Sequence, residues 1–306
     1  MRLNKYCLVV LLTVFMPLKN FSLAESSEKN ADLIVFSYNR PLQLYALLES
    51  TYRFMHNLNK IHVLYRVGNN EYNAAYNDLI TQFPSVHFVK QGNNPRGDFK
   101  PLLLKCFYDT PAKYILFAVD DDIVKDDVDV QECCAALEET NSYCFFLRLG
   151  ENITKQYGQP TICLTTPPCV EIKKDIFKYW LNDGCYGLWR YPNNVDMTMF
   201  KKSDVESFFK HSGYHSPNTL EANWAAQENL QCYGLFYKTS KMFSLPINTV
   251  QEDWVCACEF SYSASDLLKL WQDGYGFNLD QYAHMNCSSS FVSEKPTFSL
   301  RSSLNK

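Results

Sequence analysis

The stretch Tyr114-Ile115-Leu116-Phe117-Ala118-Val119-Asp120-Asp121-Asp122 decides the fold of this 306-residue chain. Its first six residues form the most apolar short run of the sequence, which predicts a buried β-strand. Three consecutive aspartates follow where that strand ends. Neighbouring carboxylates repel one another, so a fold keeps such a cluster most readily when a cation neutralises it.

Upstream of this stretch, short apolar runs alternate with segments of helical periodicity. Strands are expected at residues 33–36, 61–67, 86–89 and 114–119, and helices at residues 42–57, 71–82 and 99–108. This alternation predicts βαβ units and an α/β fold with a mostly parallel central sheet flanked by helices. Further along, a strand is expected at 144–149 and helices at 203–211, 220–232 and 264–274, with Ser203 and Glu206 as a capping box.

Two polar segments are expected at one edge of this sheet. Ligands of such sheets bind beyond the carboxyl ends of the strands. The loop Ser37-Tyr38-Asn39-Arg40-Pro41 follows the first strand, and the aspartates follow the fourth. On an extended chain Asp120 and Asp122 would point the same way, as an Asp-x-Asp pair that binds Mg²⁺ or Mn²⁺ together with substrate phosphates. The alternative is a solvated acidic turn.

Together, the Tyr-Asn-Arg-Pro loop and the Asp-Asp-Asp motif resemble those of GT-A glycosyltransferases, both of the family 2 type and of the exostosin-like group. The resemblance covers residues 31 to 150. It implies a GT-A (Rossmann-like) nucleotide-diphospho-sugar transferase fold and a metal-dependent transfer of a sugar from a nucleotide-diphosphate donor to a hydroxyl acceptor. The acceptor motif of the exostosin-like group is not visible, so the substrates of that group are not carried over.

The resemblance assigns the donor to five residues. Ser37, Tyr38 and Arg40 would contact the nucleotide base and phosphates, with Asp98 and Lys100 beside them on the donor. From the residues alone, Arg40 in a loop salt bridge and Lys100 as a solvated helix residue are equally acceptable interpretations.

The resemblance assigns the chemistry to the acidic cluster. Asp120 and Asp121 would approach the ribose and the sugar, with Asp121 as a catalytic residue, and the Asp120/Asp122 pair would hold the metal through Asp122. A metal and a cationic side chain would stabilise the leaving diphosphate. Candidates for a third metal ligand are His211, His215 and His284.

An inverting transfer also needs a carboxylate that accepts the proton of the acceptor hydroxyl. Glu221 is the first candidate, because it opens an expected helix after a Pro-Asn-Thr turn. The alternative is an ordinary first-turn acid favoured by the helix dipole. Asp196, Glu252 and Asp253 are the further candidates.

The first 24 residues are typical of a secretory signal peptide, with Arg2 and Lys5 before the apolar run 7–16 and Ser22-Leu23-Ala24 as a cleavage site. We therefore expect an exported protein, in a periplasm, a secretory lumen or outside the cell. The alternative is an uncleaved signal anchor that associates with a membrane through residues 7–18. Residues 25–306 are expected to form one catalytic domain, with a nucleotide-sugar half (25–150) and an acceptor half (151–306).

Composition and motifs limit the other functions. The net charge of −4 and the lack of a basic patch argue against a nucleic-acid partner. A nucleotidyltransferase would need a glycine-rich phosphate loop after the first strand, and the loop 37–41 contains no glycine. A glycoside hydrolase would need two carboxylates on separate elements, whereas the three aspartates are adjacent. A non-catalytic secreted carbohydrate-binding or degenerate transferase-like protein stays open as the alternative. A glycan, a lipid or a protein could each be the acceptor.

Overall fold

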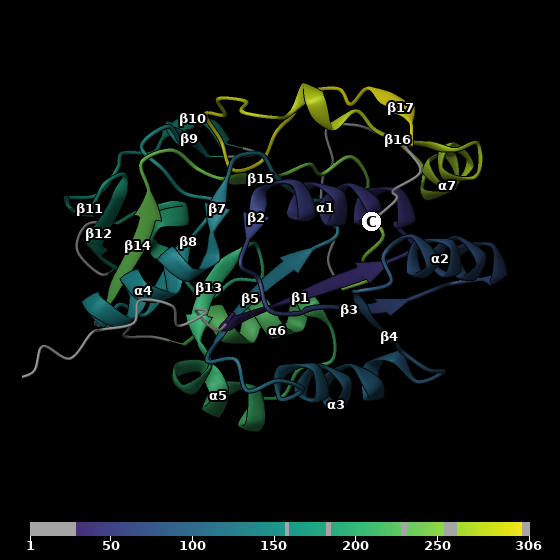
Figure 1. Ribbon diagram of the computed structural model, residues 1–306, viewed down its shortest axis with the longest axis horizontal. Coiled ribbons are helices and arrows are strands. Elements are labelled where there is room, and N and C mark those ends of the chain that lie inside the picture. Colours follow the sequence, from purple (N-terminus) through teal and green to yellow (C-terminus); the bar gives the residue numbers. More distant parts are fainter. Residues whose placement is uncertain (1–28, 157–158, 182–184, 228–231, 254–261, 302–306) are drawn as a thin grey trace, which may run out of the picture.

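The computed structural model describes residues 29–156, 159–181, 185–227, 232–253 and 262–301, which are coloured in Figure 1. The expected signal peptide lies outside these residues. Among the described helices, none combines the length and the apolar character needed to cross a bilayer. No two of the nine cysteines in this part of the chain are joined by a disulfide.

The described residues form the following elements. The helices are α1 (Pro41–Phe54), α2 (Asn70–Gln82), α3 (Pro95–Phe107), α4 (Val130–Thr140), α5 (Lys202–His211), α6 (Pro217–Ala225) and α7 (Ala264–Gln272), with 3₁₀ turns η1 (Gly187–Arg190) and η2 (Leu279–Gln281). The strands are β1 (Ala31–Tyr38), β2 (Met55–His56), β3 (Ile61–Arg66), β4 (His87–Lys90), β5 (Tyr114–Val119), β6 (Asp122–Val124), β7 (Val128–Asp129), β8 (Cys144–Phe146), β9 (Lys155–Gln156), β10 (Gln159–Cys163), β11 (Cys169–Lys173), β12 (Ile176–Trp180), β13 (Thr198–Lys201), β14 (Tyr233–Tyr237), β15 (Met242–Ser244), β16 (Tyr275–Phe277) and β17 (Phe298–Leu300).

Within the described residues, nine strands form one central sheet in the order β11-β12-β14-β8-β13-β5-β1-β3-β4. Strands β5, β1, β3 and β4 are mutually parallel. β13 runs against both β5 and β8, so β8 and its parallel neighbour β14 regain the common direction, while β12 opposes β14 and β11. Only β12 and β13 therefore run opposite to the other seven strands of this sheet. This confirms the predicted α/β class with a mostly parallel central sheet.

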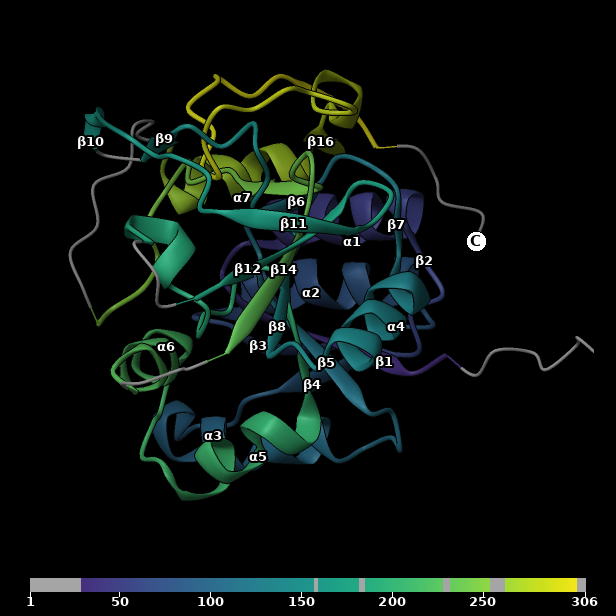
Figure 2. The ribbon, with the colours of Figure 1, turned by 90° about the vertical axis from the view of Figure 1, so that its left-hand side faces the viewer.

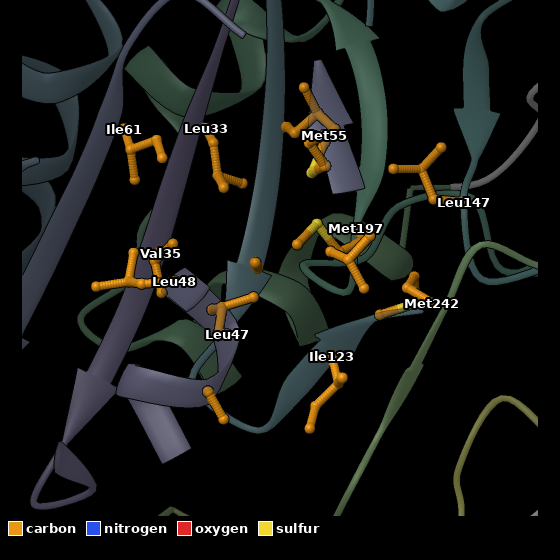
Figure 3. Packing of buried hydrophobic residues seen from close by; sticks show 14 of the residues in the cluster. Leu33, Val35, Leu47, Leu48, Met55, Ile61, Ile123, Leu147, Met197 and Met242 are labelled. Atoms are coloured by element: carbon orange, nitrogen blue, oxygen red, sulfur yellow. The ribbon is translucent and has the colours of Figure 1, made fainter. Parts of the chain in front are cut away.

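Helices cover both faces of this sheet (Figures 1 and 2). Successive side chains of β1 point to opposite faces, as strand geometry requires. Leu33 and Val35 belong to one core, with residues of α1, α2, α4 and α7. Figure 3 shows the part of this core that includes Leu47 and Leu48 of α1. Ile34 and Phe36 belong to the second core, with residues of α3, α5 and α6. Because both faces are covered, the strands read as continuous apolar runs in the sequence.

Several helix bounds differ from the sequence prediction: α3 begins at Pro95 rather than at residue 99, and α6 spans Pro217–Ala225 rather than 220–232. The capping box predicted at Ser203 is wrong, because α5 begins one residue earlier and no side chain caps it. β13 leads directly into the helix, and the free amide of Lys202 donates to the carbonyl of Lys113 instead. Capping boxes do form at the starts of α6 and α7, through Ser216 with Thr219 and Ser263 with Asp266.

Candidate active site

A cavity of about 500 Å³ lies where the parallel strands β1, β3 and β5 end. Tyr38, Arg66 and Val119, the last residues of these three strands, all line it. The start of α6 and the segment Pro246–Asp253 line it from the other side. The volume is typical of small-molecule sites, which are commonly 300–1,000 Å³. The crevice expected at the carboxyl ends of the strands is therefore present.

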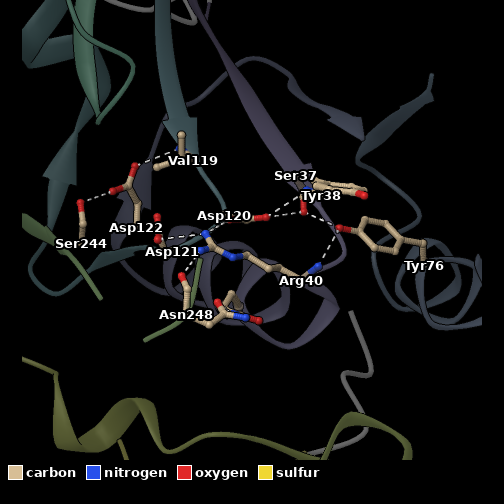
Figure 4. A network of polar contacts seen from close by, with 11 residues as sticks. Ser37, Tyr38, Arg40, Tyr76, Val119, Asp120, Asp121, Asp122, Ser244 and Asn248 are labelled. Atoms are coloured by element: carbon tan, nitrogen blue, oxygen red, sulfur yellow. Dashed lines mark hydrogen bonds and ion pairs between the residues drawn. The ribbon is translucent and has the colours of Figure 1, made fainter. Parts of the chain in front are cut away.

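The three aspartates do not lie on an extended chain. The chain turns at Asp120 and Asp121, and β6 begins at Asp122, which pairs with Ser244 of β15. The expectation that Asp120 and Asp122 face the same way is wrong for this reason. Asp120 turns toward β1, whereas Asp122 turns toward β15 (Figure 4).

Asp120 is held by the loop that follows β1. The parallel register sets Phe36 beside Val119, so Ser37 and Asp120 come next to each other. The Asp120 carboxylate accepts from Ser37 Oγ at 2.8 Å, from the Tyr38 amide at 3.2 Å and from Arg40 Nη1 at 2.9 Å. Burial nevertheless raises the pKa of Asp120. Its two oxygens are thus already occupied by protein donors.

Arg40 lies at the centre of this network (Figure 4). Its Nη1 contacts Asp120 and also Asp121, at 3.0 Å, and its Nη2 donates to the carbonyl oxygen of Asn248. The side chain is 11% exposed, so this is a largely buried ion pair within the cavity wall. The salt bridge that the sequence left open for Arg40 is therefore formed, and Arg40 also faces the cavity.

Asp122 is fully buried and does not itself line the cavity. Its oxygens accept from the Val119 amide at 3.1 Å and from Ser244 Oγ at 2.7 Å. Burial, followed by the charges of Asp196 and Asp121, raises the pKa of the Asp122 carboxyl well above its usual value.

Asp196 and Glu221 bring further carboxylates to the cavity. Asp196 pairs with Arg148 at 3.0 Å, and burial raises its pKa all the same. Burial and the charge of Asp196 raise the pKa of Glu221 to about 7, although the Tyr191 hydroxyl donates to it. A carboxyl with a pKa near neutrality is suited to general-base catalysis.

Carboxylates outnumber cations in this inner cluster. Five acids stand against the two guanidiniums of Arg40 and Arg148, which leaves an excess of three; the acids are Asp120, Asp121, Asp122, Asp196 and Glu221. The remaining arginines of the wall, Arg66 and Arg96, face Glu252 and Asp253. Buried negative charge that raises its own pKa values fits a divalent cation.

The acidic cluster fits a cation that takes only some of its ligands from the protein. The cavity carboxylates are too far apart to form a three-ligand site by themselves. Among the described residues, one group of three His, Cys, Asp or Glu side chains has its ligand atoms within 4.8 Å of one another, and it lies elsewhere in the fold. Mg²⁺ and similar cations usually bind one or two carboxylates and complete their shell with substrate phosphates and water. The cluster therefore suits a cation that arrives together with a diphosphate.

Two of the residues expected on the donor are not brought to the cavity wall. The Asp98 carboxylate accepts from the Gly92 amide at 2.8 Å and stabilises the turn before α3. Lys100 donates to the carbonyls of Lys210 and Ser212 at 2.9 and 2.7 Å, so its ammonium satisfies the end of α5. Neither side chain lines the cavity.

Of the other candidates from the sequence, some line the cavity and others do not. His215, Glu252 and Asp253 line the cavity. His284 contacts Asp126 outside it, at 2.7 Å, and His211 ends α5.

Sequence reasoning singled out Glu252 and Asp253 but missed the part played by the rest of the segment Pro246–Asp253. Asn248 accepts from Arg40 and from Gln43, and Glu252 accepts from Arg66 at 2.5 Å. The guanidinium of Arg66 also lies over the Tyr38 ring, 4.1 Å from its centre. The only local signal was a polar, irregular run with two acids at its end, which does not reveal its partners.

No protein-family model matches the chain. Among curated proteins, the bifunctional glycosyltransferase pgtA of Dictyostelium discoideum is 25% identical over 299 residues. The chain is a relative of glycosyltransferases. This relative confirms the resemblance that the two motifs indicated. The alignment covers 87% of this chain but only 38% of the Dictyostelium protein, so the chain spans less than half the length of its relative.

Solved structures of glycosyltransferases are also similar. TarS of S. aureus (residues 1–349) has a TM-score of 0.48 and 11% identity, over 70% of this chain and 60% of that one. GalNAc-T7, solved with UDP, GalNAc and Mn²⁺, has a TM-score of 0.46 and 8% identity, over 70% of this chain and 43% of that one.

Proposed function

We propose that this chain is a glycosyltransferase that moves a sugar from a nucleoside-diphosphate donor to a hydroxyl acceptor with the help of a divalent cation. The observation that carries the proposal is the convergence of Arg40, the acidic cluster and Glu221 on one cavity at the carboxyl ends of parallel strands. The relationship to glycosyltransferases supports it independently.

The donor would lie along the wall formed by the β1 loop. Leu64 and Phe99 offer an apolar surface for a base, beside the Tyr38 ring and the Arg66 guanidinium stacked on it. Arg40 lies between this surface and the acidic cluster, where it can face a diphosphate. Asp98 and Lys100 are left out of this assignment, because their side chains bind neighbouring backbone groups.

The cation would lie against Asp121 and Asp196, which line the cavity, with the buried Asp122 adding negative charge behind them. Burial and the charges of neighbouring aspartates raise the pKa values of Asp122 and Asp196, so this group gains most from a positive charge. A bound cation would offset the negative charge that develops on the departing diphosphate. Asp120 is assigned a positioning role, because it orients the Ser37–Arg40 loop.

Glu221 would act as the base. The bond between the sugar carbon and the phosphate oxygen breaks, and its electron pair leaves on the nucleoside diphosphate. The acceptor oxygen bonds to the same sugar carbon, and its proton passes to the Glu221 carboxylate. Ionised Glu221 and a neutral hydroxyl acceptor are thereby converted to a protonated acid and a new glycoside.

The acceptor and the location belong to the same proposal. We propose a glycan, lipid or protein hydroxyl as acceptor and an exported protein, on the strength of the signal-like residues 1–24. Assay of the purified chain with each acceptor class, and fractionation of expressing cells, would test these two points.

The decisive experiment is a panel of nucleotide sugars incubated with Mn²⁺, Mg²⁺ or a chelator, with release of UDP or GDP as the readout. The wild type should release nucleotide from one donor only when the cation is present. Asp122→Ala and the cavity-lining Asp121→Asn should lose this release. Asp127→Asn, an exposed aspartate paired with His56, is the matched control and should keep it.

Circular dichroism and thermal melting would confirm that the variants are folded. Equal release by the wild type and both cluster variants would refute the site. Absence of release from every donor would instead favour a non-catalytic carbohydrate-binding protein.

A further inference from the structure

A second group of ligand-type side chains lies at the opposite end of the same strands. His62 is the second residue of β3 and His87 is the first of β4, whereas Arg66 and Gln91, which follow about 13 Å further along an extended chain, line the cavity. Asp109 follows the end of α3, whose start also lines the cavity. These residues have no part in the proposed transfer.

The parallel register sets His62 directly beside His87, so their rings share one face of the sheet. Their Nδ1 atoms are 3.0 Å apart, and one ligand atom from each of His62, His87 and Asp109 lies within 4.8 Å of the others. Two nitrogens bound to one tetrahedral Zn²⁺ at about 2.05 Å would be about 3.3 Å apart. The two rings therefore need to separate by only a few tenths of an ångström.

The state of His62 also suits a ligand. The side chain is fully buried, and its Nε2 has no hydrogen-bond partner among the described residues.

We propose that His62, His87 and Asp109 bind a borderline transition-metal ion, best matched by Zn²⁺, at the edge of the sheet opposite the cavity. Two imidazoles and one carboxylate are ligands that such ions favour, whereas the all-carboxylate cluster of the cavity suits hard cations. Because Asp109 lies at the surface, the remaining position is open to water.

Such a site would join the far ends of β3, β4 and α3. Each of these elements carries a cavity residue at its other end, namely Arg66, Gln91 and Arg96. The bound ion would therefore stabilise the wall of the cavity without contacting a substrate.

Lys60 provides a sharp test, because its Nζ lies 2.5 Å from Asp109 Oδ2 and competes for the same oxygen. Untagged, chelator-treated protein would be titrated with ZnCl₂ by calorimetry, and with CoCl₂ by visible absorption. We expect one Zn²⁺ per chain and a higher melting temperature. His87→Ala and Asp109→Asn should each weaken binding by at least about tenfold, and Lys60→Ala should strengthen it.

The controls separate this site from the cavity. His284→Ala removes a histidine that is likewise paired with an aspartate, Asp126, and should leave Zn²⁺ binding unchanged. Asp121→Asn, which tests the transferase site, should also leave it unchanged. The proposal is overturned if the wild type binds no Zn²⁺ at micromolar concentration, if Asp109→Asn binds as tightly as the wild type, or if Asp121→Asn abolishes binding.

Discussion

Glu221 shows how burial can prepare one side chain for proton transfer. Replacement by Gln keeps the shape and removes the proton acceptor. We expect kcat to fall by about 10²–10⁴ with little change in the KM for the donor, since a general base contributes about that much. Steady-state kinetics would measure both constants. Glu206→Gln, at an exposed acid of α5 paired with Lys210, should leave both unchanged.

The same residue sets a pH dependence. Only ionised Glu221 accepts a proton, and its pKa is raised to about 7. Activity should therefore fall as the pH drops through 7, and this acidic limb should vanish from the residual activity of Glu221→Gln. An acidic limb near pH 4.5, the range of an ordinary glutamate, would contradict the assignment.

Arg40 and Asp120 form a buried pair, and removal of one partner leaves the other charge uncompensated. We expect Arg40→Ala to lower the free energy of unfolding by roughly 3–5 kcal/mol. The double variant with Asp120→Asn should lose less than the sum of the single losses, as urea unfolding would show. The exposed pair Arg53–Asp280 is the control, and its removal should cost less than about 1 kcal/mol. Additive losses at the buried pair would refute the coupling.

At the scale of elements, α6 and α7 offer a matched comparison. Both begin with a capping box whose serine, Ser216 or Ser263, accepts from the helix backbone. Ser216→Ala and Ser263→Ala should each cost about 1 kcal/mol of stability. Only Ser216→Ala should also reduce turnover, because α6 carries Glu221 and Ser216 binds Asp253 at 2.5 Å. Equal activity in the two variants would separate α6 from catalysis.

Element by element, the first half of the chain could be predicted closely. The strands that became β1, β3 and β5 are buried on both faces, so their apolar runs stand out without tertiary information. The turn at Asp120 could not be predicted, because no glycine or proline marks it. Its shape depends on Ser244, which binds Asp122 from 122 positions further along the chain.

The candidate site was predictable only where the sequence puts chemistry at a strand end. Tyr38, Arg40 and Asp121 were found in this way. Asn248 and Arg66 were not, because an ordinary amide and a strand-end arginine gain their meaning from partners about 200 positions away. The resemblance places Lys100 on the donor, and nothing local in the sequence reveals that its ammonium meets the end of α5.

At the scale of the whole molecule, the acidic cluster should make the cation-free protein less stable as the pH rises. The pKa of Asp122 lies above its unfolded value near 3.8, so the folded chain holds the extra proton between these two values. By linkage, stability is lost as the pH rises through that window. The Asp122→Asn side chain does not titrate. The free energy of unfolding of this variant should therefore increase relative to that of the wild type as the pH rises, by at most about 1.4 kcal/mol per pH unit.

Urea unfolding of both proteins in chelator, from pH 4.5 to 8, would measure this difference. In Asp127→Asn, the exposed control, the difference from the wild type should stay constant over the same range. A difference that stays constant as the pH rises would mean that Asp122 is ionised in the folded chain over the whole range.

The hydrogen bonds that Ser244 and Asn248 give and receive have a consequence for synthesis. A ribosome makes Arg40 and Asp122 long before it makes these two partners. Until then, the emerging polypeptide contains the strands of the sheet but not the groups that satisfy its innermost charges. Such an intermediate exposes apolar surface and is prone to aggregate. We therefore expect yield in a foreign host to depend on chaperone supply and on translation speed over the last third of the message.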